Sequence, residues 1–317
     1  MTERGDRYDV LTMGRVGVDL YPQQSGVPLA EVRTFAKSLG GTATNVAVAA
    51  ARYGLRTAVI TKVGDDGFGP YVHQALRGFG VDDRFVGTDP ALRTPVVFCE
   101  LFPPDSFPIL FYRQPKAPDM NVRVEELDLD AIGSARIFWT TGTGLSDEPS
   151  RSATLAALEA RGRAEITVHD MDYRAMFWRS PEEAGELQRR ALALATVAVG
   201  NREEAAVAVG EGEPDDLADR LLALGLSIAV VKLGPEGVLV AWSNGRECIP
   251  PVHVEVVNGL GAGDAFGGAL CHGLLEGWDV VSTIRFANAA GAYVASQLAC
   301  ADAMPDEATV RELMRRG

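Results

Sequence analysis

A glycine-rich stretch near the C-terminal end of the chain combines a phosphate-binding pattern with a carboxylate. Residues 256–266 read Val-Val-Asn-Gly-Leu-Gly-Ala-Gly-Asp-Ala-Phe, which predicts a strand end, a turn with glycines at alternate positions, and the start of a helix. Such glycines let backbone N–H groups converge on an anion, which the helix dipole also attracts. We therefore predict an anion hole at Gly261, Ala262 and Gly263. The stretch lacks the Lys-Ser/Thr pair of a P-loop and does not match the dinucleotide-binding fingerprint.

Asp264 directly follows these glycines. Phosphate repels a neighbouring carboxylate, so we expect such a residue to do chemical work, for example to accept the proton of a substrate hydroxyl. The alternative is a helix-capping aspartate that contributes about 1 kcal/mol to stability. The motif alone leaves both interpretations open.

A second glycine-containing turn, Gly40-Gly41, precedes an apolar helix predicted over residues 43–53. The paired glycines allow the backbone to approach a ligand closely, and Asn45 could present its amide to hydroxyl groups. A turn followed by a helix cap explains the same residues without any ligand.

Strands and helices alternate over most of the chain and must position these residues. The runs rich in β-branched residues predict strands, and several helices between them end at a glycine. This alternation favours right-handed βαβ units and a doubly wound α/β/α sandwich around a parallel sheet. The predicted strands are 8–13, 57–63, 135–139, 165–169, 196–199, 227–233 and 237–242, and the chain after Gly259 is predicted to be helical over 262–275, 281–298 and 306–315.

Two segments interrupt this rhythm. Residues 16–38 and 93–113 are extended and punctuated by prolines, as antiparallel strands projecting from the sheet would be. We predict that they form a small β lid on a single domain spanning residues 1–317. The unpaired edges of such a lid would offer a surface for a homodimer.

Composition and charge exclude several classes of protein. The 317 residues, 47% of them hydrophobic, are typical of a soluble globular protein, and the net charge of -13 without a basic stripe argues against nucleic acid or anionic membranes as partners. No signal-peptide pattern precedes the first strand, and the longest apolar stretch, 191–199, is too short to span a bilayer, so we expect a cytoplasmic protein. We expect buried thiols in a reducing compartment, without metal-ligand spacing, at Cys99, Cys248, Cys271 and Cys300.

The two glycine motifs together resemble the paired signatures of the ribokinase-like (PfkB) carbohydrate kinases. Residues 40–47, Gly-Gly-Thr-Ala-Thr-Asn-Val-Ala, and residues 261–266, Gly-Ala-Gly-Asp-Ala-Phe, carry this resemblance. Three further motifs extend it, in family order, over essentially the whole chain: Gly14-x-x-Gly17-x-Asp19, Asn201-x-x-Glu204 and Lys232-Leu233-Gly234-Pro235-Glu236-Gly237. The resemblance implies a ribokinase-like fold, ATP-dependent phosphorylation of a sugar hydroxyl with Mg²⁺, and a β lid that closes over the sugar.

The resemblance also implies roles for individual residues. Asp264 would accept the hydroxyl proton, and the amides of residues 261–264 would hold the charge of the transferring phosphoryl group. Without the resemblance, Asn201-x-x-Glu204 is a plain capping box and the Gly234–Gly237 segment a β-turn. The other implied contacts are Asp19, Gly41 and Asn45 with sugar hydroxyls, Asn201, Lys232, Gly234, Gly237, Gly261, Gly263 and Asn288 with the nucleotide, and Glu204 with Mg²⁺ through water.

Within the family, several segments resemble kinases of sugar acids. Phe111-Tyr112-Arg113 is one, and residues 170–178, Asp-Met-Asp-Tyr-Arg-Ala-Met-Phe-Trp, are another; residues 13–22, 141–145 and 301–305 point to one subgroup of these kinases. A guanidinium fork matches a carboxylate bidentately, so Arg113 and Arg174 would select an acid over a neutral sugar. Surface salt bridges are the alternative for both. A kinase of a neutral sugar or nucleoside, and a sugar-acid sensor without activity, are the competing functions.

Two positions depart from the family pattern. Asn258-Gly259 stands where the family usually has Asp-Thr, in a region that contributes to a monovalent-cation site in relatives. This predicts weak or absent potassium dependence. Asp172 stands where sugar-acid kinases often have Asn.

Overall fold

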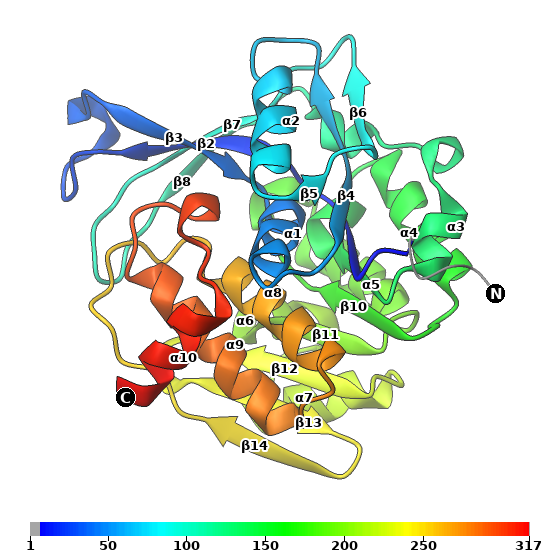
Figure 1. Cartoon of the computed structure of the whole chain (residues 1–317). Helices are drawn as coiled ribbons and strands as arrows, with labels where there is room; N and C mark the ends of the chain where they lie inside the picture. Colours follow the sequence, from blue (N-terminus) through cyan, green and yellow to red (C-terminus); the bar gives the residue numbers. More distant parts are fainter. Residues whose placement is uncertain (1–6, 317) are drawn as a thin grey trace.

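A large mixed sheet forms the centre of the computed structural model, which describes residues 7–316 (Figure 1). Residues 1–6, part of the segment predicted to lack a signal peptide, lie outside the described residues. Within the described part of the chain the sheet has ten strands in the order β14-β13-β12-β11-β10-β9-β1-β4-β5, with β6 paired to β4. The strands are β1 (Val10–Met13), β4 (Thr57–Gly64), β5 (Val81–Asp82), β6 (Val86–Asp89), β9 (Ile137–Thr141), β10 (Ile166–Asp170), β11 (Val197–Asn201), β12 (Ile228–Lys232), β13 (Val238–Trp242) and β14 (Gly245–Ile249).

Helices cover both faces of this sheet, because its strands are apolar on both sides. Trp139 packs with α1, α8 and α9 on one face, and its neighbour Phe138 packs with α4 and α5 on the other; both are fully buried. The α/β/α prediction is therefore confirmed. The helices are α1 (Thr42–Arg52), α2 (Gly69–Gly78), α3 (Leu129–Ser134), α4 (Ser150–Arg161), α5 (Pro181–Leu192), α6 (Arg202–Val209), α7 (Pro214–Ala223), α8 (Ala262–Leu275), α9 (Val280–Ala295) and α10 (Glu307–Arg316).

The central sheet is mixed, whereas the alternation of strands and helices predicts a parallel one. β13 runs antiparallel to β12, and β14, which the sequence did not predict, runs antiparallel to β13. Cys248 lies on β14 and is exposed, so the prediction of four buried thiols is wrong at this position; Cys99, Cys271 and Cys300 are buried. An edge strand has a solvated face, which explains the exposed thiol.

A second sheet, which we call the small sheet, projects beside α1 (Figure 1). Its strands are β2 (Gly17–Pro22), β3 (Phe35–Gly40), β7 (Val96–Cys99) and β8 (Ile109–Tyr112), in the order β3-β2-β7-β8. The pairs β2–β3 and β7–β8 are antiparallel, but β2 and β7 pair in parallel, with Val18 opposite Val96. The expectation of antiparallel strands throughout is wrong for this pair, because the two hairpins enter the sheet from separate parts of the chain.

None of the helices in the described part of the chain combines the length and the apolar character that a membrane span requires.

Candidate active site

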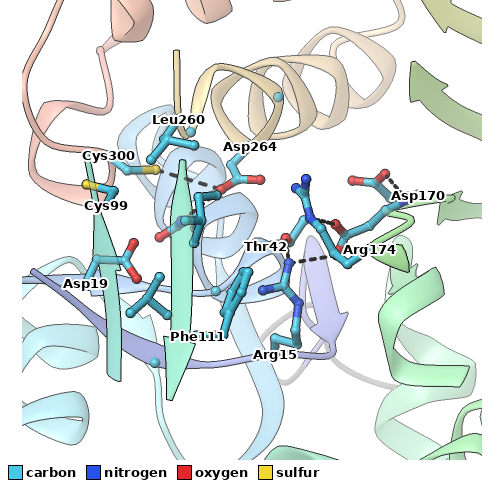
Figure 2. A pocket seen from close by; sticks show the side chains of 18 of the residues that line it. Arg15, Asp19, Thr42, Cys99, Phe111, Asp170, Arg174, Leu260, Asp264 and Cys300 are labelled. Carbon is cyan, nitrogen blue, oxygen red and sulfur yellow. Dashed lines mark hydrogen bonds and ion pairs between the residues drawn. The ribbon is translucent and has the colours of Figure 1, made fainter. Parts of the chain in front are cut away.

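A cavity of about 270 Å³ opens where the small sheet faces the carboxyl ends of the central strands (Figure 2). Arg15 follows β1, Asp172 follows β10, and Asn201 and Lys232 end β11 and β12. The beginnings of α1 and α8 complete this wall. The sheet order brings these separate segments to one edge, which is the usual ligand-binding edge of an open α/β sheet.

Asp264 points into the cavity from the first turn of α8 and is held by two neighbours. The Asn45 amide Nδ2 donates to Asp264 Oδ2 at 2.8 Å, and the Cys300 thiol donates to the same oxygen at 3.8 Å. α8 has no side-chain cap, since Gly261 is its N-cap residue. The capping interpretation of Asp264 is therefore wrong, and Asp264 Oδ1 is left to face the cavity.

Gly261 is required by a close approach at the start of α8, and Gly263 leaves room for a neighbouring lysine. Gly261 has φ +83°, and a Cβ there would lie 2.1 Å from the Cys300 sulfur. A Cβ on Gly263 would lie 3.1 Å from Lys232 Nζ, so the lysine ammonium lies over the first turn of the helix. Unpaired N–H groups and an ammonium therefore converge beside Asp264, as an anion hole requires.

Burial raises the pKa of Asp264 and Asp19, two carboxylates of the cavity. Burial raises the pKa of Asp264 to about 6, although the hydrogen bond from Asn45 acts in the opposite direction. Burial likewise raises the pKa of Asp19, on β2, to about 6, against the hydrogen bond from the Tyr21 hydroxyl at 3.1 Å. Both side chains contact the cavity but are enclosed by protein, which explains the loss of solvation.

The sugar-contact predictions place residues in the same cavity. Asp19, Gly41 and Asn45 all line it. The Asn45 amide oxygen is buried and has no hydrogen-bond partner among the described residues. A buried acceptor without a partner is costly, and a ligand hydroxyl would satisfy it.

The predicted nucleotide and metal residues divide into two groups. Asn201, Lys232 and Glu204 line the cavity together with Gly261 and Gly263. Asn201 and Glu204 also form the capping box that starts α6, so both interpretations of this motif hold. Four other predicted residues do not line the cavity: Ala262, Gly234, Gly237 and Asn288. Gly237 and Asn288 both lie next to Pro250, whose carbonyl accepts a hydrogen bond from Asn288.

The two arginines predicted to bind a carboxylate both line the cavity, but they differ in their pairing. Arg113 donates from both terminal nitrogens to the Asp119 carboxylate, at 3.1 and 2.5 Å, and both side chains are buried. The Arg174 Nε lies 3.2 Å from Asp172 Oδ1, and its side chain is 39% exposed. No hydrogen bond from the Arg174 guanidinium occurs within residues 7–316.

Two residues of the cavity wall, Arg15 and Asp170, were not predicted from the sequence. Both line the cavity and are buried. Arg15 lies inside the Gly14-x-x-Gly17 motif directly after a strand, a position that could have identified it. Burial raises the pKa of Asp170, and so does repulsion from Asp172 and Glu204, whereas Lys232 acts to lower it.

The comparisons with known proteins agree on one family. A profile described as "pfkB family carbohydrate kinase" matches residues 8–307. The chain is 35% identical to a 5-dehydro-2-deoxygluconokinase of Photobacterium profundum, over 94% of this chain and 92% of the relative.

Solved structures with similar folds hold relevant ligands. An uncharacterised sugar kinase from Pyrococcus horikoshii, in complex with ATP, is 26% identical over 96% of this chain and 99% of its own, with a TM-score of 0.80. A fructokinase double mutant from Vibrio cholerae O395, with fructose, ADP and potassium ion bound, is 27% identical over 98% of this chain and 99% of its own, with a TM-score of 0.85.

Proposed function

This chain belongs to the pfkB family of carbohydrate kinases and is an ATP-dependent sugar kinase, and on that premise we propose 5-dehydro-2-deoxy-D-gluconate as its acceptor, in the breakdown of myo-inositol. The observation that carries the proposal is the Asp264 carboxylate at the start of α8, in one cavity with buried guanidinium groups. A sugar hydroxyl beside Asp264 and an acid group near an arginine would use both features. 2-Dehydro-3-deoxygluconate is the second candidate.

Asp264 would act as the general base. Its Oδ1 faces the cavity, while Asn45 fixes Oδ2 and so orients the carboxylate. A pKa near 6 leaves the group ionised at neutral pH yet still able to take the hydroxyl proton as the new O–P bond forms. The amides of residues 261–264 and the Lys232 ammonium would stabilise the charge on the phosphoryl oxygens.

Mg²⁺ fits the donors on the nucleotide side of the cavity. Asp170 and Glu204 are carboxylates whose mutual repulsion a cation would relieve. No group of three or more His, Cys, Asp or Glu side chains within residues 7–316 forms a metal cage. Mg²⁺ commonly binds through one or two carboxylates together with phosphates and water, and it would supply charge neutralisation when the nucleotide binds.

The competing functions are a kinase of a neutral sugar or nucleoside and a sensor without activity. A coupled assay of ADP release with purified protein separates them. We expect ATP turnover with 5-dehydro-2-deoxygluconate at least about tenfold more efficient than with a neutral sugar, from the contribution of one charged contact. Turnover only with neutral acceptors would support the first alternative, and binding of the acid without turnover the second.

We also propose that the protein acts in the cytoplasm, where ATP is available, and that it forms a homodimer through the small sheet. Leu110 and Tyr112 on the edge strand β8 are 47% and 61% exposed. Large apolar side chains on an open sheet edge favour association with another chain.

A further inference from the structure

Arg15 is a buried cation in the wall of the cavity. The side chain is 8% exposed and is fixed by partners from three other segments. Its Nε donates to the Thr143 hydroxyl at 3.0 Å, and its Nη2 donates to the Thr42 hydroxyl at 2.6 Å and to Asp172 Oδ2 at 2.9 Å. The guanidinium carbon also lies 5.8 Å from the centre of the Phe111 ring, on the small sheet.

This fixation leaves one end of the guanidinium available. Nη1 of Arg15 makes no hydrogen bond within residues 7–316. Figure 2 shows the Arg15 guanidinium beside Phe111 and below Asp264, and both Arg15 and Asp264 line the cavity. Because Arg side chains lose much of their rotamer entropy when they bind, a guanidinium already held by three partners is preorganised for a ligand.

Asp172 holds Arg15 and Arg174 at the same time. Burial alone would raise the pKa of Asp172, but the two guanidinium charges and hydrogen bonds from Arg15 and Thr143 hold it well below its usual range. Asp172 has φ +22°, an unfavourable conformation for a residue with a side chain. The backbone is thus strained at the residue that positions both guanidinium groups.

Arg113 differs from Arg15 in how its guanidinium is paired. Its two terminal nitrogens both bond to Asp119, whose Oδ2 also accepts the Val16 N–H at 3.0 Å. The Arg113 charge is therefore neutralised by a carboxylate of its own. Arg15 and Arg174 share the Asp172 carboxylate as their ion-pair partner, whereas Asp119 and Asp264 act on Arg15 only through longer-range attraction.

Resting on the proposed function, we infer that Arg15, positioned by Asp172 and joined by Arg174, binds the carboxylate of the acceptor, and that Arg113 instead anchors β8. The acceptor class is then a monoanionic acid whose carboxylate reaches Arg15 while its reacting hydroxyl reaches Asp264, because both residues line the same cavity. Asp19 and Asp264 would repel an acid, and the guanidinium groups of Arg15 and Arg174 in the same cavity offset this repulsion.

The test compares two matched pairs of substitutions. Arg15→Met/Asp172→Asn removes the proposed contact together with its buried partner, and Arg113→Met/Asp119→Asn removes a similarly buried ion pair. Removing both charges avoids leaving an uncompensated buried ion, and Arg15→Lys serves as a milder variant if the first fails to fold. For each protein we would measure kcat/KM for 5-dehydro-2-deoxygluconate and for its carboxamide, with a thermal melt as the test of folding.

We expect the acid-to-amide ratio of kcat/KM to fall by about 10- to 150-fold in Arg15→Met/Asp172→Asn, the loss of one charge-assisted contact. In Arg113→Met/Asp119→Asn the ratio should stay within about threefold of the wild type, whatever the loss of rate. A folded Arg15 variant that keeps the wild-type ratio, or a fall confined to the Arg113 pair, would overturn the inference. A wild-type enzyme that phosphorylates no sugar acid would instead overturn the proposed function.

Discussion

Asp264 lines the cavity, and its raised pKa suits it to accept a proton near neutral pH. Asn45 ties the base at the start of α8 to α1, so the two glycine motifs of the sequence meet at one hydrogen bond. The same amide presents its unpaired oxygen to the cavity. One residue therefore orients the base and offers an acceptor to the sugar.

Replacing Asp264 with Asn should remove the base and keep the size of the side chain. Turnover should fall by roughly 10²- to 10⁴-fold with a modest change in KM, measured by ADP release. Asp279→Asn is the matched control, because Asp279 caps α9 far from the cavity and Asn caps equally well. Wild-type turnover in Asp264→Asn would show that another group takes the proton.

The pH dependence follows from the raised pKa of Asp264, about 6. The base works only when ionised, so kcat/KM should rise with pH through about 6 and level off above it. Retention of this rise in Asp264→Asn would assign it to another group, such as Asp19.

The raised pKa of Asp264 also makes the stability of the fold depend on pH. The folded state binds this proton more tightly than the unfolded state, so Asp264 destabilises the fold as pH rises from about 4 to 6. Chemical denaturation should therefore show Asp264→Asn gaining stability relative to wild type over that interval.

The role of a residue could be predicted from the sequence only where a local sequence pattern points to it. The motif that contains Gly261, Gly263 and Asp264 follows an extended segment and starts a helix. Its role depends mainly on this local structure and little on contacts with distant residues. Asp119 and Thr143 carry no such pattern, because their contacts with Val16, Arg15 and Asp172 join residues far apart in the chain. Arg113 illustrates the difference: its type suggested a carboxylate ligand, but its partner is a carboxylate of the protein itself.

At the scale of elements, one side chain joins the turn before α8 to the segment after α9. The Asn258 amide donates to the Leu298 carbonyl at 2.7 Å, and its oxygen accepts the Leu260 N–H at 3.0 Å. A carboxylate in this place could not donate to that carbonyl. Two facing acceptors would need a cation between them, whereas the amide satisfies both directly.

We therefore predict weak potassium dependence in this enzyme. Rates in potassium and in tetramethylammonium at equal ionic strength should agree within about threefold, because Asn258 carries no negative charge and its oxygen already accepts the Leu260 N–H. Asn258→Asp should lower the rate in tetramethylammonium and restore it with potassium. A wild-type enzyme that loses most activity without potassium would contradict this account.

The alternation of strands and helices could be predicted because each element carries its own periodicity and end signals. The antiparallel edge strand β14 could not, since residues 245–249 are short and half polar. Nor could the parallel pairing of β2 with β7, which depends on how two separate hairpins meet. Local sequence patterns thus predict the helices and strands themselves better than they predict which strands pair with each other.

At the scale of the whole molecule, the net charge of -13 would repel both ATP and an acid. The cavity counters this field locally with Lys232 and the arginines at the strand ends. We therefore expect the rate at which substrate binds to depend on these few cationic side chains in the cavity and less on the charge of the whole surface.

The proposed homodimer gives a prediction at this scale. Light scattering after gel filtration should report twice the mass of one chain, and Tyr112→Lys on β8 should shift the protein toward the monomer. Val124→Lys is the control, since Val124 is also exposed, at 41%, but lies outside the small sheet. A monomeric wild type at micromolar concentration would exclude this surface as the dimer interface.

The parallel contact between β2 and β7 has a consequence for the order in which the chain folds. The pairing of Val18 with Val96 closes a long loop that contains β3, α1, β4, α2, β5 and β6, and the entropy cost of this closure favours late formation of the contact. Short strands with one solvated face also sit at the low end of local stability. Amides of β7 should therefore exchange with deuterium through local opening, while those of Phe138 and Trp139 exchange only when the whole molecule unfolds. We therefore expect the wall that carries Asp19 and Phe111 to open locally while the strand ends that hold Arg15 and Lys232 keep their structure.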